Sequence, residues 1–328
     1  MRNTQNSPAA ASPFADIFLA LAGPTACGKS NFALRLAEAF SGEIISIDSG
    51  AVYCGMDIGT AKPDSAMQAR IRHHLIDVCA PNEDFNVGRF CQLVAAAVQD
   101  IQSRGRRPIL AGGTMMYYQA LSQGLHEMPT PSAAVRQQVR EQMKKHGAAA
   151  MHQKLAAVDA ATAAKLSPTD TQRLGRAWEI LTATGKPLSA WLAGQKRPLL
   201  PNLHFVLLLP SERMMLRQAI GRRLDNMFAA GLVEETRQII NRWHLPPAAT
   251  PLRLAGYRQA AAFLRGEINA ADMRQQAYFA TCQLAKRQMT WLRRWPNEAI
   301  ILDPFDRQTT ARMLAWGQNK TATHSPLS

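Results

Sequence analysis

The sequence has no long apolar run, no paired cysteines and few acidic residues for its many basic ones. The apolar run at residues 17–23 is far shorter than the roughly 20 residues that cross a bilayer, and it leads into a glycine-containing loop rather than a cleavage site. The five cysteines form no CxxC pair and show no zinc-ligand spacing, which argues against a disulfide framework and a structural zinc site. We therefore expect a cytoplasmic protein without a membrane anchor.

Acidic residues are scarce. The 24 Asp and Glu stand against 38 Lys and Arg, which gives a formal net charge of +14 over 328 residues. Such a charge favours a polyanionic partner, because each Lys or Arg that meets a phosphate releases condensed counterions. A basic but solvated surface is the alternative, and net charge alone does not decide between them. No heptad or broad apolar stripe requires a partner chain, so we expect a monomer.

A phosphate-binding loop is the first motif in the chain. The stretch "GPTACGKS" fits GxxxxGK[ST] and comprises Gly23, Pro24, Thr25, Ala26, Cys27, Gly28, Lys29 and Ser30. An apolar strand pattern precedes it at 16–23 and a helix pattern follows at 29–40, which is the context this motif needs. Backbone N–H groups, Lys29 and the Ser30 hydroxyl are expected to hold a phosphate chain with its Mg²⁺. The motif indicates a ligand group but no reaction.

Further apolar runs predict more strands of the same sheet. They lie at 43–48, 107–113 and 203–210, with helical sequence between them. This alternation predicts an α/β fold, a P-loop NTPase-like parallel sheet flanked by helices. Ligands of such sheets bind beyond the carboxyl ends of the strands. Asp48 and Thr114 should therefore meet the phosphate loop in one crevice.

Composition also divides the chain into parts. Residues 129–202 are rich in Ala, Gln and Arg and read as an all-helical insertion into a core formed by 14–128 and 203–300. Residues 1–13 read as a disordered leader and 308–328 as a flexible tail.

Several acidic and imidazole side chains are candidates for chemistry. Asp48 is suited to cap a turn, to bind Mg²⁺ or to act as a base. The strand at 107–113 ends without an acid, so Asp77 could hold the metal instead and leave Asp48 as the base. His73 and His74 lack a second ligand cluster, and we expect them to pack and hydrogen-bond locally.

Two basic helical segments indicate phosphate contacts. Arg223 lies at the edge of an apolar stripe whereas Arg222 points away. An inward arginine pairs with a carboxylate or a bound phosphate, and the excess of bases favours phosphate. In 273–295, Lys286, Thr290 and Arg293 form a basic ridge with Arg287 and Arg294 at its boundary. The expected apolar face comprises Met273, Ala277, Ala280, Leu284, Trp291 and Trp295. Arg253 and Arg258 lie just upstream, and together these residues predict contacts with a nucleic-acid backbone.

Seven ordered stretches resemble one family, the tRNA dimethylallyltransferases, also called tRNA isopentenyltransferases, of the bacterial type. They are "GPTACGKS", "DSGAVYCGMDIGTAKP", "HHLIDV", "GGTMMYYQAL", "DTQRLGRAWEI", "AGYRQ" and "QLAKRQMTWLR", and they run from about residue 16 to residue 295. The resemblance implies transfer of a dimethylallyl group from dimethylallyl diphosphate to N6 of the adenosine 3′ of the anticodon. It implies tRNAs that read codons beginning with U, and a loop that holds a diphosphate ester.

The resemblance also implies roles for residues. Asp48 matches the base, and Thr25, Thr114, Arg136 and Arg223 match positions linked to the leaving group, substrate binding and catalysis. Ser30 matches the Mg²⁺ position. The matched tRNA-binding residues are Asp48, Ser49, Gly50, Ala51, Gln172, Arg173, Leu174, Gly175, Arg176, Arg253, Leu254, Ala255, Gly256, Tyr257, Arg258, Lys286, Arg287, Gln288, Met289, Thr290, Trp291, Leu292 and Arg293.

The chain departs from the family pattern at a few positions. Gly50 and Ala51 stand where many members have Met and Gln, Cys282 where many have Arg, and Trp178 where Leu is usual. These departures affect the details of tRNA contact rather than the reaction. A small-molecule kinase, a non-catalytic RNA-binding NTPase module and a prenyltransferase of free adenine nucleotides remain as competing hypotheses.

Overall fold

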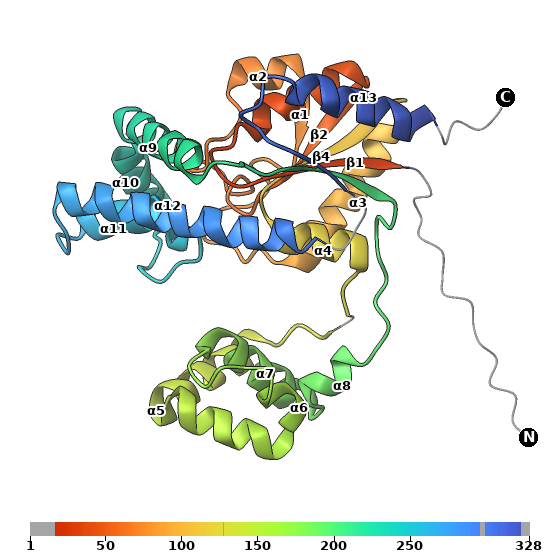
Figure 1. The fold of residues 1–328 in the computed structure, drawn as a ribbon. Coiled ribbons are helices and arrows are strands. Elements are labelled where there is room, and N and C mark those ends of the chain that lie inside the picture. Colours follow the sequence, from red (N-terminus) through yellow and green to blue (C-terminus); the bar gives the residue numbers. More distant parts are fainter. Residues whose placement is uncertain (1–16, 127, 296–298, 323–328) are drawn as a thin grey trace, which may run out of the picture. The chain divides into compact units, whose positions relative to one another are not determined.

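The computed structural model describes residues 17–126, 128–295 and 299–322, and it contains two compact units (Figure 1). One combines the chain up to Ser122 with the chain from Leu199 onward, and the other spans Gln123–Pro198. The predicted leader, 1–13, lies outside the described residues. Within the part that is described, no helix has the length and apolar character needed to cross a membrane.

A six-stranded sheet forms the centre of the first unit. Its strands are β1 (Phe18–Ala22), β2 (Gly42–Ile47), β3 (His73–His74), β4 (Arg107–Gly112), β5 (Leu203–Leu208) and β6 (Ala299–Leu302). Their order is β3-β2-β4-β1-β5-β6, and every neighbouring pair is parallel. The predicted α/β fold with a parallel sheet is confirmed. The two short edge strands, β3 and β6, were not predicted from the sequence.

Helices cover both faces of this sheet (Figure 1). Leu19 and Leu21 of β1 belong to the core layer with α1 (Lys29–Ala39) and α13 (Thr309–Ala322). Phe18 and Ala20 belong to the layer with α3 (Val87–Ser103) and α4 (Met115–Gln123). This alternation follows from the two-residue period of a strand and buries both faces of the sheet.

Four helices form a further group in the same unit (Figure 1). They are α9 (Arg213–Ala229), α10 (Leu232–Trp243), α11 (Tyr257–Leu264) and α12 (Ala270–Arg293). A short α2 (Ser65–Arg70) and a 3₁₀ turn (Pro251–Arg253) complete the unit.

The expected apolar face of α12 was partly wrong. Its buried residues are Met273, Ala277, Thr281, Ala285, Met289 and Leu292, whereas Trp291 is 44% exposed. Helix α12 packs against α9 and α11, so the stripe that it buries is the one that faces these helices. Leu284 and Trp291 therefore lie on a neighbouring stripe.

The second unit, Gln123–Pro198, is built from helices, and an isolated antiparallel bridge joins Leu125 and Arg197. Its helices are α5 (Ala133–Val158), α6 (Ala160–Ala163), α7 (Thr171–Thr184) and α8 (Leu188–Leu192), and α5 is kinked at Gly147, where φ is 77°. The small core comprises Met151, Leu155, Ala163, Leu174 and Ala177. Trp178 packs against this core and its Nε1 donates to the Met151 carbonyl at 3.2 Å. The unusual tryptophan therefore has a packing role.

The C-terminal stretch also differs from expectation. Helix α13 spans Thr309–Ala322, where we expected a flexible tail over 308–328. Met313 of this helix is fully buried and belongs to the core layer of α1. Thr309 and Gly317, one turn before and after Met313, are also buried, but neither is a large apolar side chain, so the apolar stripe is a weak sequence signal.

Candidate active site

The phosphate loop connects β1 to α1. Gly28 adopts φ 81° immediately before α1, a conformation that costs glycine little. The loop thus leads into α1, whose first N–H groups have no partner within the helix. Such free N–H groups can bind an anion. Lys29 Nζ donates to the Pro24 carbonyl at 2.6 Å. Burial lowers the pKa of Lys29, while the nearby Cys27 and Asp48 oppose this shift.

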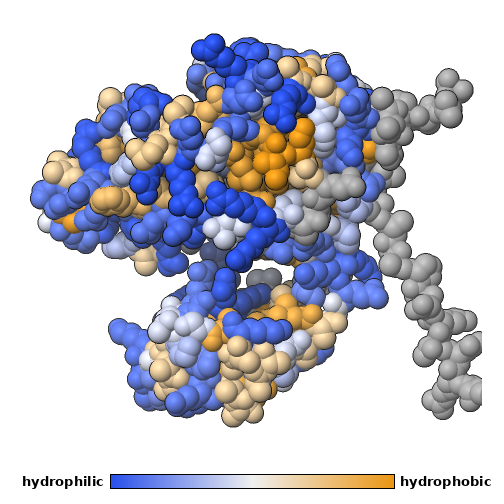
Figure 2. All heavy atoms as spheres, viewed as in Figure 1, coloured by the Kyte–Doolittle hydropathy of each residue, from blue (hydrophilic) through white to orange (hydrophobic). Residues whose placement is uncertain are grey.

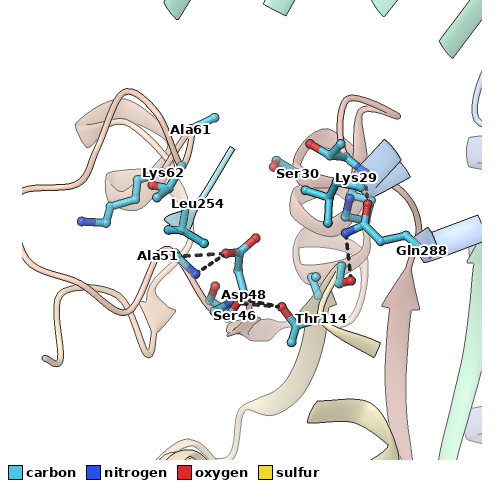
Figure 3. Close-up of a pocket in the computed structure, with 18 of the residues that line it drawn as sticks. Lys29, Ser30, Ser46, Asp48, Ala51, Ala61, Lys62, Thr114, Leu254 and Gln288 are labelled. Atoms are coloured by element: carbon cyan, nitrogen blue, oxygen red, sulfur yellow. Dashed lines mark hydrogen bonds between the residues drawn. The ribbon is translucent and has the colours of Figure 1, made fainter. Parts of the chain in front are cut away.

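One cavity of about 430 Å³ collects the predicted catalytic residues of the sheet unit. Its lining includes Thr25, Lys29, Ser30, Asp48, Thr114 and Arg223. The carboxyl ends of β1, β2 and β4 supply the first five, as the parallel-sheet rule predicts. Figure 3 shows Asp48 and Thr114 on one side of this cavity with Lys29 and Ser30 across from them.

Asp48 directly follows β2 and is held by its own loop. Its Oδ1 accepts the N–H of Gly50 at 2.7 Å and that of Ala51 at 3.3 Å. Within the described residues no hydrogen bond reaches its second oxygen, Oδ2. A carboxylate fixed by one oxygen and open at the other is suited to accept a proton.

Thr114 braces the same loop from β4. Its Oγ1 accepts the N–H of Ser49 at 3.1 Å, and its own N–H donates to the Ile47 carbonyl at 3.1 Å. A Cβ at Gly112 would lie only 2.0 Å from the Ile47 carbonyl oxygen. Only glycine permits this close approach of β2 and β4, which brings Thr114 beside the residue after Asp48.

Arg223 enters the cavity from α9, whereas Arg222 is exposed, as predicted. The Arg223 guanidinium donates to the Thr60 carbonyl at 3.3 Å. Burial lowers the pKa of Arg223, and the charge of Asp48 opposes this shift. Arg223 is half-buried, and a cation there that bonds to a neutral carbonyl is poised to bind an anion.

Gln288 has a position that the sequence did not indicate. From α12 its Oε1 accepts the N–H of Thr25 at 2.8 Å, and its Nε2 donates to the Gly113 carbonyl at 2.9 Å (Figure 3). It therefore joins α12 to the phosphate loop and to the end of β4. The matched segment 286–293 included Gln288 only as a tRNA contact, and a polar residue beside a basic ridge gave no signal of this inward bond.

The basic ridge is exposed. Lys286, Arg287, Arg293 and Arg294 form no ion pair with any described residue. Figure 2 shows a mostly hydrophilic surface over α9 to α12. Arg253 and Arg258 are also exposed, and Ser49, Gly50, Ala51, Leu254, Ala255, Arg287, Gln288 and Trp291 line the cavity or its rim. By contrast, Gly256, Tyr257, Met289 and Leu292 are buried.

Other predicted residues belong to the helical unit. Arg136 lies on α5, and Gln172, Arg173, Gly175 and Arg176 lie on α7, where Leu174 is buried in the small core. Arg173 and Arg176 pair within their own helix region, with Asp170 at 3.4 Å and Glu179 at 3.8 Å. Their roles in substrate binding stay predictions.

Asp77 and the two histidines have local partners. Asp77 forms an ion pair with Lys62 at 2.5 Å and does not line the cavity, so the hypothesis that it holds the metal gains no support. His73 Nδ1 contacts the Ile71 carbonyl and His74 Nε2 contacts Glu43, each at 2.7 Å. Both histidines have hydrogen-bond partners in the same unit, as predicted, and His73 also lines the cavity.

The oxygen donors of the cavity fit Mg²⁺. Among the described residues no three His, Cys, Asp or Glu side chains group as metal ligands. Mg²⁺ does not need such a cage beside a phosphate ligand, because it keeps waters and binds phosphate oxygens with one or two protein oxygens. Ser30 at the start of α1 and Asp48 both line the cavity, so the ligand types that this ion prefers are present.

Comparison with known proteins identifies the family. The model described as IPP transferase matches residues 51–295. The chain belongs to the IPP transferase family. The tRNA dimethylallyltransferase of Thiobacillus denitrificans is 48% identical over 284 residues, which cover 86% of this chain and 90% of that protein. The tRNA dimethylallyltransferase of Bordetella avium is 45% identical, with coverage of 90% and 95%.

Solved structures of related transferases are similar to this chain in fold and in sequence. A full-length tRNA isopentenylpyrophosphate transferase from Bacillus halodurans is 30% identical with a TM-score of 0.67, covering 94% of this chain and 97% of that one. A eukaryotic dimethylallyltransferase, described as acting on tRNA, is 25% identical with a TM-score of 0.80, covering 95% and 81%.

Proposed function

We propose that this protein transfers a dimethylallyl group from dimethylallyl diphosphate to N6 of the adenosine 3′-adjacent to the anticodon. The acceptors are tRNAs that read codons beginning with U, and the products are N6-dimethylallyladenosine and diphosphate. The observation that carries the proposal is the cavity in which the open Oδ2 of Asp48 shares one space with the phosphate loop and Arg223. Relatives named tRNA dimethylallyltransferase support the choice of substrates.

The phosphate loop and Arg223 would hold the diphosphate. Lys29, Arg223 and the N–H groups at the start of α1 neutralise charge that grows on the leaving oxygen as the C–O bond breaks. Mg²⁺, held by the Ser30 hydroxyl, would supply further neutralisation of the diphosphate when bound. Thr25 lies on the same loop and lines the cavity, and it would donate its hydroxyl to the leaving group.

Asp48 would accept the proton of the acceptor amine. An exocyclic adenine amine is a poor nucleophile, because its lone pair is shared with the ring. As the N6 lone pair forms the bond to C1 of the dimethylallyl group, the C1–O electrons leave with the diphosphate. The N6 proton passes to Asp48 Oδ2, while Oδ1 stays bound to Gly50 N–H. Thr114 keeps this loop in place through Ser49.

The adenosine must leave its stack to reach such a cavity. The exposed Lys286, Arg287 and Arg293 on α12, with Arg253 and Arg258, would contact the RNA backbone. The helical unit would add contacts through Gln172, Arg173 and Arg176, and Arg136 is proposed to assist substrate binding. Gly50 and Ala51 have no polar side chain, so they would offer shape rather than a base-edge hydrogen bond.

A direct assay tests the proposal. Purified protein is incubated with Mg²⁺, labelled dimethylallyl diphosphate and unmodified tRNA, and the digested RNA is analysed for N6-dimethylallyladenosine. Parallel reactions contain ATP with a metabolite acceptor, or free AMP with dimethylallyl diphosphate. Product on tRNA alone supports the proposal. ATP turnover would favour a kinase, and prenylated AMP would favour a nucleotide prenyltransferase.

A further inference from the structure

One carboxylate outside the cavity holds the start of a loop that lines the cavity. Glu235 lies in the first turn of α10. Its Oε2 accepts the N–H of Asp57 at 2.9 Å and that of Ile58 at 2.8 Å, and its Oε1 accepts the N–H of Gly59 at 3.2 Å. Three successive backbone donors therefore converge on a single side chain some 176 residues away in sequence.

A buried tyrosine completes this cluster. The hydroxyl of Tyr257, at the start of α11, donates to Glu235 Oε1 at 2.5 Å. Tyr257 is fully buried, and burial followed by the charge of Glu235 raises its pKa far above the usual range, so the phenol keeps its proton. A Cβ at Gly59 would lie 2.4 Å from the ring of Tyr257. The loop thus lies flat on the ring, and its N–H groups reach the carboxylate.

The loop held in this way is part of the candidate active site. Gly59, Thr60, Ala61 and Lys62 line the cavity with Asp48 and Arg223. The Thr60 carbonyl accepts from Arg223 at 3.3 Å. The methyl group of Thr60 also lies 2.9 Å from where a Cβ of Gly50 would be, so the same residue packs beside the Asp48 loop.

A positioning role for Glu235 follows from these contacts. We propose that Glu235, with Tyr257, fixes the loop at 57–62 so that the Thr60 carbonyl aims Arg223 at the diphosphate. Glu235 touches neither substrate nor the reacting atoms and does not line the cavity. The inference rests on the proposed transfer reaction and adds to it a residue that sets leaving-group electrostatics from outside the cavity.

A glutamine substitution isolates the interaction. Glu235→Gln keeps the shape of the side chain but replaces one acceptor oxygen with an NH₂ that faces backbone N–H groups, so the loop loses at least one bond. We expect kcat/KM for dimethylallyl diphosphate to fall about 10- to 100-fold, equivalent to about 1.4 to 2.7 kcal/mol. The Kd for tRNA should stay unchanged, because Glu235 bonds to backbone N–H groups of the 57–59 loop and to the buried Tyr257 hydroxyl, and none of these is an exposed basic side chain proposed to contact RNA.

A double-substitution cycle separates positioning from general weakening. In an Arg223→Ala background, Glu235→Gln should cost less than about 3-fold, since the group that it positions is gone. Equal losses in both backgrounds, or a folded Glu235→Gln protein with wild-type kcat/KM, would overturn the inference. Glu234→Gln, one residue away and paired with Arg237 on the surface, is the matched control and should behave as wild type.

Two further measurements keep the test decisive. If Glu235→Gln does not fold, Tyr257→Phe removes one bond to the same carboxylate, and the same cycle with Arg223→Ala applies. Melting temperatures are recorded for every variant. Wild-type transfer to tRNA is measured in the same assay, so absence of product in the wild type would refute the proposed function, whereas additive losses would refute only the role of Glu235.

Discussion

Asp48→Asn is the sharpest test of the proposed chemistry. The amide oxygen of asparagine can still accept the N–H groups of Gly50 and Ala51, now held at 2.7 and 3.3 Å. The open Oδ2 becomes an NH₂, which cannot take a proton from the adenosine amine. The substitution thus keeps the loop and removes the base.

The expected loss follows from what a base contributes. General-base catalysis supplies about 10²- to 10⁴-fold, which is about 3 to 5 kcal/mol of the barrier. We expect the single-turnover rate of prenyl transfer to fall by that factor, with the Kd for tRNA and the melting temperature unchanged. Single-turnover conditions, with enzyme in excess over labelled tRNA, exclude product release from the measured rate.

Asp77→Asn is the matched control, because Asp77 is a loop carboxylate of the same unit that pairs with Lys62 and does not itself line the cavity. It should change the rate by less than about 3-fold. An Asp48→Asn protein that transfers within about 5-fold of wild type would refute the base assignment. A large loss in Asp77→Asn, with Asp48→Asn nearly intact, would move the chemistry to Asp77.

Three further predictions concern other parts of the molecule. The double variant Lys286→Ala, Arg293→Ala should weaken binding of all tRNA sequences alike and lower the slope of log Kd against log salt concentration by about 2, with the KM for dimethylallyl diphosphate unchanged. Binding titrations at several salt concentrations measure this slope, and an unchanged slope would contradict the prediction. Gln288→Ala should lower kcat/KM for dimethylallyl diphosphate about 10-fold, since Thr25 N–H and the Gly113 carbonyl lose their partner. Gln288→Glu should lower kcat/KM further, because it adds negative charge beside the phosphate loop. A Gln288→Glu enzyme as active as wild type would count against the role of Gln288. For Glu43, burial raises the pKa of the carboxyl, but hydrogen bonds from Arg104 and His74 outweigh burial and lower it. The contribution of Glu43 to the free energy of unfolding is therefore present above the unfolded pKa of about 4.3 and is lost as pH falls through the lower folded value. Urea unfolding at about pH 7 and about pH 3 should show that the difference in free energy of unfolding between wild type and Glu43→Gln shrinks in acid, and a constant difference would exclude this linkage.

Much of the site could be predicted from sequence because its groups follow strands. The phosphate loop, Asp48 and Thr114 each come directly after an apolar strand, and parallel strands bring their carboxyl ends to one edge. Arg223 was found by helical periodicity, since it lies at the edge of a buried stripe. These are local signals combined with a single rule of sheet topology.

The groups that the sequence did not indicate act over long separations. Gln288 bonds a loop 263 residues away, and Glu235 bonds one about 177 residues away. No local pattern marks a polar side chain that bridges two elements, because its partners are mostly backbone groups, which every residue type carries. The buried face of α12 was predicted partly wrongly for a related reason, since the position of the neighbouring helices determines which stripe of a helix is buried.

These long-range bonds divide the candidate site into locally and distantly held parts. Asp48 is fixed by its own loop, whereas Thr25 depends on Gln288 of α12, and Arg223 depends on a loop fixed by Glu235 of α10. The group that would take the proton thus has its hydrogen bonds within its own loop, whereas Thr25 and Arg223, which would meet the diphosphate, are held from α12 and α10. Substitutions that disturb these helices should therefore appear first in kcat/KM for dimethylallyl diphosphate, even where the altered residue contacts no substrate.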